Sequence, residues 1–184
     1  YTNQTHVEVP EGFKIEKLLA PTADSLGSWV SLTHVKENLF VSSDQYGQIY
    51  WLKMPEIGSK DSIQVTPLDF NHLGKAQGLL WSHNSLYVMM NDRNIQNSGL
   101  YRLFDSSQDG QLDSALFLQQ LDGWGEHGPH GIQLGPDQLI YVIAGNHTDL
   151  PNNYTSTAHS PWAEDRMLKS MKDPNGHATD RQAP

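Results

Sequence analysis

One pattern of residues occurs three times along this chain, at intervals of about 50 residues, and it limits the fold more than any other feature. Each copy begins with an apolar segment, passes through a short polar turn and continues as a second apolar segment that carries an aromatic residue. Those aromatic residues are Phe40, Tyr87 and Tyr141. The first two copies add another strand-like run, at 47–52 and 99–103. Such spacing is typical of stacked units that are built from the same few elements.

The repeated units are predicted to be β-sheets. Short runs rich in Val, Ile, Leu, Tyr and Phe recur, each closed by Gly, Asn, Asp or Pro, whereas helical periodicity is rare. In the first unit we expect strands at 13–19, 29–34, 39–43 and 48–52. Sheets that pack radially form a β-propeller, which closes through about four to eight blades. The expected fold is therefore all-β, a β-propeller of four-stranded antiparallel blades with only about three blades present.

The repeat also predicts the domain organisation. The blades are expected at approximately 9–55, 66–122 and 127–150 onward, so that residues 1–184 form one partial propeller domain. The segment 151–184 is polar and interrupted by prolines. We interpret this segment as an irregular excursion between blades.

Charge and composition exclude several classes of partner. The formal net charge is −9, and the acidic residues are spread along the chain, so phosphate backbones are repelled and no nucleic-acid partner is expected. No apolar run approaches the roughly 20 residues that cross a bilayer, so we expect no membrane span in this chain. Because cysteine is absent, disulfides, thiolate metal ligands, a cysteine nucleophile and c-type haem attachment are excluded within this sequence.

The most specific stretch is 126–137, Glu-His-Gly-Pro-His-Gly-Ile-Gln-Leu-Gly-Pro-Asp, followed by a tyrosine strand and Gly-Asn-His-Thr at 145–148. It resembles the glucose/sorbosone dehydrogenase family, which are sugar dehydrogenases with a β-propeller and the cofactor pyrroloquinoline quinone (PQQ). More narrowly, it is similar to bacterial membrane-bound dehydrogenase-like proteins in which a haem-binding region often follows the propeller. The likeness covers 9–184.

The chain departs from the family pattern at two places. Gln138 stands where the family usually has glycine after Pro-Asp, and we expect only a slight weakening because glutamine fits a type I turn. The arginine that follows the family's histidine is replaced by the region of His130 and Gly131. The substrate contacts of the family therefore do not transfer directly.

The resemblance implies a quinone-dependent dehydrogenase that oxidises a hydroxyl of a sugar or alcohol. His127 matches the family's catalytic histidine and would act as general base, since imidazole accepts protons at neutral pH. Glu126 would orient the ring or raise its basicity. Contacts to the cofactor are expected from Trp124, His130, Asn146 and His147.

The same likeness implies a periplasmic or extracellular protein that passes electrons to a haem domain outside this chain. The chain begins with Tyr1 and not with a start methionine, which we interpret as a processed or trimmed N-terminus.

The segment 105–113 has the oxygen-ligand spacing of a calcium loop. Side-chain oxygens stand at loop positions 1, 3, 5 and 9, and glycine at position 6. The four ligands would be Asp105, Ser107, Asp109 and Asp113. Leu116 replaces the bidentate glutamate of such loops, so calcium would bind weakly. The alternative is a polar hairpin turn that closes a blade.

Other interpretations of the histidines stay open. His127 is otherwise a loop residue at the central channel of the propeller. His127, His130 and His147 would form a transition-metal site with Asp149 if their rings converged.

A function of another class is also consistent with the sequence, namely a non-catalytic propeller that recognises a carbohydrate or a protein. A dehydrogenase needs cations to hold the carboxylates of the quinone, and no Lys or Arg stands beside His127 in the sequence. This lack counts against dehydrogenase activity of the chain alone.

Overall fold

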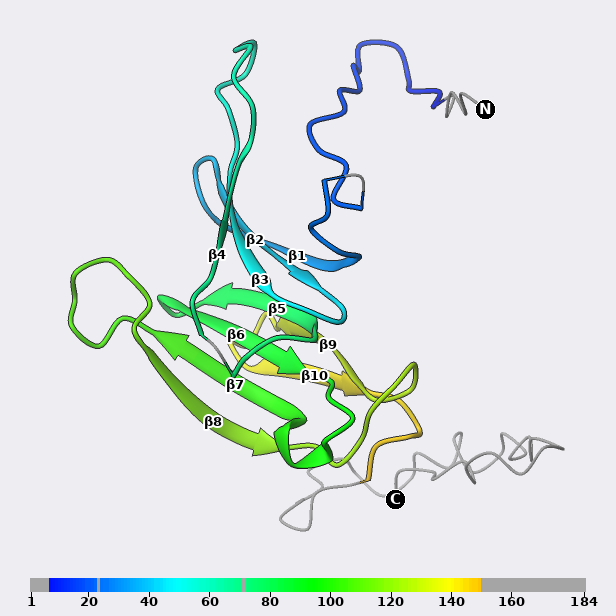
Figure 1. Cartoon of the computed structure of the whole chain (residues 1–184), viewed down its shortest axis with the longest axis vertical. Coiled ribbons are helices and arrows are strands. Elements are labelled where there is room, and N and C mark those ends of the chain that lie inside the picture. Colours follow the sequence, from blue (N-terminus) through cyan, green and yellow to red (C-terminus); the bar gives the residue numbers. More distant parts are fainter. Residues whose placement is uncertain (1–6, 23, 71, 150–184) are drawn as a thin grey trace, which may run out of the picture.

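The structure, a computed structural model, describes residues 7–22, 24–70 and 72–149. Within these ranges the chain is all-β, with one 3₁₀ segment, η1 (Ile95–Asn97) (Figure 1). None of the helical structure there is long and apolar enough to cross a membrane. The strands in chain order are β1 (Trp29–Lys36), β2 (Leu39–Asp44), β3 (Ile49–Lys53), β4 (Gln64–Pro67), β5 (Ala76–Ser82), β6 (Ser85–Met90), β7 (Gly99–Phe104), β8 (Ser114–Gln120), β9 (Pro129–Leu134) and β10 (Ile140–Ala144).

The strands form two four-stranded antiparallel sheets and one hairpin. The first sheet has the order β1-β2-β3-β4, the second β5-β6-β7-β8, and β9 pairs with β10. The pairing partners place Thr33 against Val41, Leu79 against Val88, and Ile132 against Val142. The aromatic positions of the repeat therefore lie at the same place in each unit, and the prediction of antiparallel four-stranded sheets is confirmed.

The first sheet corrects one expected strand. The strands expected at 29–34, 39–43 and 48–52 are present as β1, β2 and β3, but the segment 13–19 forms no strand. Phe13 is 73% exposed and Ile15 57% exposed, so their alternation does not bury a face.

The fourth strand of this sheet is instead β4, which pairs with β3 at the opposite edge. The first sheet consequently extends to Pro67 and not only to residue 55. In the third unit the described residues give β9 and β10, and the segment expected as an excursion, 151–184, lies outside the described residues.

The core lies between the first and second sheets. Trp51 and Trp81, from β3 and β5, meet edge to face beside it, with ring centroids 6.3 Å apart. Burial of aliphatic side chains at this interface supplies the main driving force for joining the sheets. The buried members are Val41, Ile49, Leu68, Leu73, Ala76, Leu79, Leu86, Val88, Met90 and Leu103.

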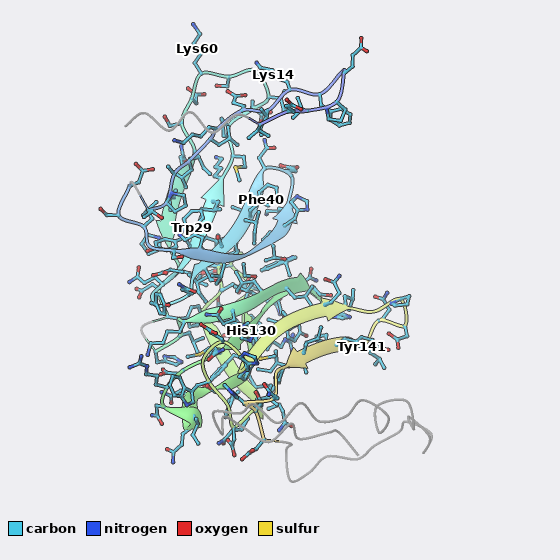
Figure 2. The ribbon with its side chains drawn as sticks, turned by 90° about the vertical axis from the view of Figure 1, so that its right-hand side faces the viewer. Lys14, Trp29, Phe40, Lys60, His130 and Tyr141 are labelled. Carbon is cyan, nitrogen blue, oxygen red and sulfur yellow. The ribbon has the colours of Figure 1, made fainter. Side chains whose placement is uncertain are left out.

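Strand β5 packs between β1 on one side and β9 on the other (Figure 2). On the β1 side, the backbone N–H of Leu79 donates to Oγ of Ser31 and that of Trp81 to Oγ1 of Thr33, each at 3.0 Å. On the β9 side, Gly78 lies so near the carbonyl of His130 that a Cβ atom there would overlap the carbonyl oxygen. Contacts to the backbone of β5 thus fix the spacing of the three units.

Because β5 and β9 approach closely at Gly78, a side chain there should destabilise the fold. In Gly78→Ala the new methyl group meets backbone, which cannot move aside, so we expect a loss of about 1–3 kcal/mol of unfolding free energy. Gly131 has the equivalent register in β9, but a Cβ there meets only side-chain atoms of Ile143, the nearest at 3.6 Å. Gly131→Ala should therefore be neutral or slightly stabilising. Urea unfolding measures both, and equal effects would contradict the packing.

The hairpin turn between β9 and β10 shows what a glycine after Pro-Asp would contribute. The N–H of Gln138 donates to the carbonyl of Gly135 at 3.0 Å, which closes the turn, and Gln138 itself has φ of 66°. The glutamine thus occupies the left-handed position after the turn, not a type I position as expected. A residue with a Cβ atom is strained in this conformation.

We therefore expect Gln138→Gly to raise the free energy of unfolding by about 0.5 kcal/mol, since relief of strain exceeds the added freedom of the unfolded chain. Gln111→Gly, in another loop but without a left-handed φ, is the control and should lower it. Thermal unfolding of the two variants measures the difference. A destabilised Gln138→Gly would show that the turn holds no strain.

Candidate functional site

A cavity of about 520 Å³ lies where loops of all three units meet. The β2–β3 turn, the start of β5, the loop after β6 and the segment leading into β9 each contribute side chains. Gln77 in β5 and His130 in β9 are equivalent in the repeat, because each lies two residues before the residue that pairs with Val88 or Val142. The lining residues are Gln45, Tyr46, Lys75, Gln77, Asn91, Arg93, Trp124, Gly125, Glu126 and His130.

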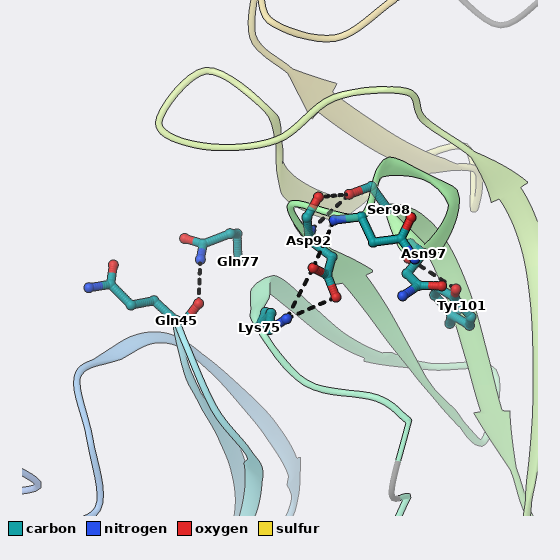
Figure 3. Close-up of polar contacts among 8 residues, drawn as sticks. Gln45, Lys75, Gln77, Asp92, Asn97, Ser98 and Tyr101 are labelled. Atoms are coloured by element: carbon teal, nitrogen blue, oxygen red, sulfur yellow. Dashed lines mark hydrogen bonds and ion pairs between the residues drawn. The ribbon is translucent and has the colours of Figure 1, made fainter.

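An ion pair holds one cation at this cavity (Figure 3). Nζ of Lys75 lies 3.0 Å from both carboxylate oxygens of Asp92. The backbone N–H of Asp92 donates to Oγ of Ser98 at 2.8 Å, which fixes the loop after β6. The Lys75 side chain remains 45% exposed, so its ammonium can also donate to a ligand.

The pKa of Asp92 reflects this network. Burial by itself raises the pKa of the carboxyl, but hydrogen bonds from Lys75 and from the N–H of Asn94 outweigh burial. The pKa therefore lies below its ordinary value. Asp92 stays ionised at neutral pH and keeps Lys75 beside the cavity.

The side chain of Asn91 fixes the opposite wall. Its Oδ1 accepts from the N–H of Gly125 at 2.8 Å, and its Nδ2 donates to the carbonyls of Gly125 at 2.8 Å and Pro129 at 3.1 Å. This amide therefore links the end of β6 to the segment that carries Trp124 and to the start of β9. The guanidinium of Arg93 lies over the Trp124 ring, 5.5 Å from its centroid, which is a cation–π contact.

The structure brings together three of the expected site residues, Trp124, Glu126 and His130, at the cavity. His127 and His147 are exposed and lie outside the cavity lining, with ring centroids 4.7 Å apart. Asn146, beside His147, also lies outside the lining. In the described part of the chain, no three His, Asp or Glu side chains gather as a metal site.

The expected calcium loop is exposed, and its carboxylates bind the loop's own N–H groups. Asp105 accepts from the N–H of Gln108 at 2.6 Å and of Gly110 at 2.7 Å. Asp113 accepts from the N–H and hydroxyl of Ser106, each at 2.8 Å, and these hydrogen bonds hold its pKa well below the ordinary range. The geometry is that of a hairpin closed by Asx-type turns, and calcium binding stays a prediction.

Seven lining residues were not predicted from the sequence: Gln45, Tyr46, Lys75, Gln77, Asn91, Arg93 and Gly125. The repeat itself carried the signal that would have found several of them. Tyr46 follows Phe40 by six residues, as Arg93 follows Tyr87 by six, and both line the cavity. The positions just after the aromatic strand are therefore candidate site positions in all three units.

The ion pair at the cavity gives a pH-dependent test. Because the folded pKa of Asp92 lies below its unfolded value of about 3.9, its stabilising contribution is present above that pH and is lost as pH falls through the folded pKa. We expect Asp92→Asn to cost about 1 kcal/mol near pH 7 and progressively less below about pH 4. Urea unfolding between about pH 3 and 7 measures this difference. Asp69→Asn, at an exposed position, should stay within about 0.5 kcal/mol, and a pH-independent cost in Asp92→Asn would contradict the linkage.

Comparison with protein families and curated proteins identifies no family for the chain. No family model matches it, and no curated protein matches it. The function therefore has to be inferred from the residues of the cavity and their geometry.

Proposed function

We propose that this chain binds a sugar or a similar polyhydroxy alcohol beside a quinone and oxidises one hydroxyl of the substrate. The observation that supports this proposal is the convergence of Lys75, Arg93, Trp124 and His130 on one cavity, from two different units of the fold. The set combines cations, an aromatic face and an imidazole. These are the groups that an anionic aromatic cofactor and an oxidisable hydroxyl require.

The residues present fit a quinone that carries carboxylates, such as PQQ. Lys75 and Arg93 supply the cations that are absent beside His127 in the sequence. A guanidinium binds a carboxylate through two N–H groups at once, whereas an ammonium acts as a point charge. Trp124, 48% exposed, offers a ring face for stacking.

The same cavity has groups suited to a sugar. Gln45 and Gln77 lie side by side, with Nε2 of Gln77 donating to the backbone carbonyl of Gln45 at 3.3 Å. Side-chain amides both donate to and accept from hydroxyl groups. Tyr46 is 76% exposed and presents an aromatic ring at the cavity, where it would pack on the apolar face of a sugar ring.

When bound, the quinone supplies the acceptor for the hydride that leaves the substrate carbon. The chain's own residues orient the hydroxyl and remove its proton. The resemblance to sugar dehydrogenases implies His127 for the proton transfer, with Glu126 beside it. Electrons would then pass to a haem domain outside this chain, in a periplasmic or extracellular protein.

The same proposal includes the propeller fold, in which the two four-stranded sheets and the β9–β10 hairpin are successive blades. Its support is the repeated packing of β1 on β5 and of β5 on β9. In a propeller the first strand of each blade lines the central channel, and ligands bind at the loops around one end of that channel. In a propeller of this kind, the loops that line the cavity would be among them.

A second candidate is carbohydrate recognition without catalysis. The amides of Gln45 and Gln77, together with the rings of Tyr46 and Trp124, favour it. Neither of the two candidate functions depends on the Asp105 loop. Calcium bound there would stabilise the loop.

Titration of the chain with PQQ and calcium, followed by absorbance and then by addition of aldoses and alcohols, tests the proposal. We expect Arg93→Gln to weaken quinone binding at least about 10-fold, the loss expected for a charge-assisted hydrogen bond. Arg102→Gln is the matched control because its guanidinium also lies over an aromatic ring, that of Phe104, but outside the cavity.

Quinone binding followed by sugar-dependent reduction would support the dehydrogenase. Sugar binding without quinone binding would favour the recognition function. If neither ligand binds at millimolar concentration, or if both arginine variants behave alike, the cavity is not the site.

A further inference from the structure

We infer that His130, and not His127, accepts the proton of the substrate hydroxyl, and that it does so through Nε2. This inference rests on the proposed oxidation of a hydroxyl at the cavity. Its basis is that His130 lines the cavity and is half-buried, whereas His127 is exposed and outside the lining. A proton acceptor must reach the hydroxyl directly or through one water, so position decides between the two imidazoles.

The hydrogen bond of His130 fixes its tautomer. Nδ1 of the ring lies 2.7 Å from the backbone carbonyl of Gly128. A carbonyl oxygen can only accept a hydrogen bond, so Nδ1 carries the proton in the neutral ring. Nε2 then has the free lone pair, and it lies on the side of the ring away from this backbone contact. The neutral ring is therefore prepared to accept a proton at Nε2.

The carbonyl that orients the ring is itself held in place. The N–H of Gly145 also donates to the carbonyl of Gly128, at 3.1 Å. Gly128 has no room for a side chain, because a Cβ atom would meet Trp124 at 2.7 Å and Nδ2 of Asn91 at 2.8 Å. With Asn91 also bonded to Pro129, the backbone on both sides of the Gly128 carbonyl is fixed. The orientation of the imidazole is thus set by main chain.

The His127 ring packs against another histidine outside the cavity. The backbone carbonyl of His127 accepts from the N–H of His147 at 3.0 Å, and its ring packs against the His147 ring. The two rings form an exposed pair beside the start of β9 and the end of β10. This contact keeps the His127 ring with His147, outside the set of side chains that encloses the cavity.

Proton transfer to His130 accompanies oxidation of the alcohol. The O–H bond of the alcohol breaks and its proton moves to Nε2 of His130, while a C=O bond forms. The C–H bond breaks with its electron pair, and the hydride would pass to the bound quinone, which is the oxidant. His130 becomes an imidazolium, and Glu126, another residue of the same cavity, has the opposite charge.

The first test reads the tautomer and needs no cofactor. Long-range ¹H–¹⁵N NMR spectra of the histidine rings distinguish protonation at Nδ1 from protonation at Nε2. We expect His130 in the Nδ1–H form at a pH where the ring is neutral, with the assignment made by its loss in His130→Gln. Protonation of the neutral ring at Nε2 would overturn the inference, whatever the cavity binds.

The second test uses PQQ and glucose with matched variants. We expect His130→Ala to bind PQQ within about threefold of the parent but to lose at least about 100-fold in reduction rate, the usual contribution of a general base. Added imidazole should restore part of that rate, which a merely structural role would not allow. His127→Ala should lose far less rate than His130→Ala, and the control His83→Ala, at an exposed turn outside the cavity, should retain both binding and rate.

The outcomes separate the two proposals. Loss of the rate in His127→Ala, with retention in His130→Ala, would overturn this inference and leave the proposed function standing. Absence of PQQ binding in the parent chain would contradict the proposed function, and the NMR spectra would still decide whether His130 is held as described.

Discussion

The backbone edge of β5 sets how the three units of the fold pack on one another. As the first strand of its sheet, β5 would present unpaired N–H and C=O groups to its neighbour, and buried groups of this kind cost about 1–3 kcal/mol each when left unsatisfied. The first sheet satisfies them with short hydroxyl side chains. Ser31 and Thr33 accept from β5, and Oγ of Ser43 donates to the carbonyl of Ala76 at 2.8 Å. Two sheets that share no strand pairing are joined in one register by these contacts.

The cavity follows from that register. Just before β5, the N–H of Lys75 donates to the carbonyl of Gly47, and the N–H of Asn91 donates to the carbonyl of Lys75. The start of β5 is therefore held between the β2–β3 turn and the end of β6. Lys75 and the side chain of Asn91 consequently face one space, which the Trp124 segment encloses from the third unit. Cations and an imidazole meet there because backbone hydrogen bonds set the positions of the loops.

The sequence predicted the sheets better than the site, and the reason is the range of the interactions. Strand and turn patterns are local, so the strands at 29–34, 39–43 and 48–52 could be predicted, whereas 13–19 alternates without a partner strand and stays exposed. His130 stands in the distinctive stretch 126–137 and Trp124 lies two residues before it, and both were expected at the site. Lys75 and Arg93 belong to another unit, and only packing of the sheets brings them near.

The β9–β10 hairpin shows how far the same packing could extend. Gly131 has the register of Gly78, and Tyr141 and Ile143 beside it are 54% and 69% exposed. Gly78 is covered by β9, whereas a Cβ at Gly131 would meet only the side chain of Ile143 among the described residues. A further sheet that packed on β9 as β9 packs on β5 would cover these side chains and add its loops to the cavity.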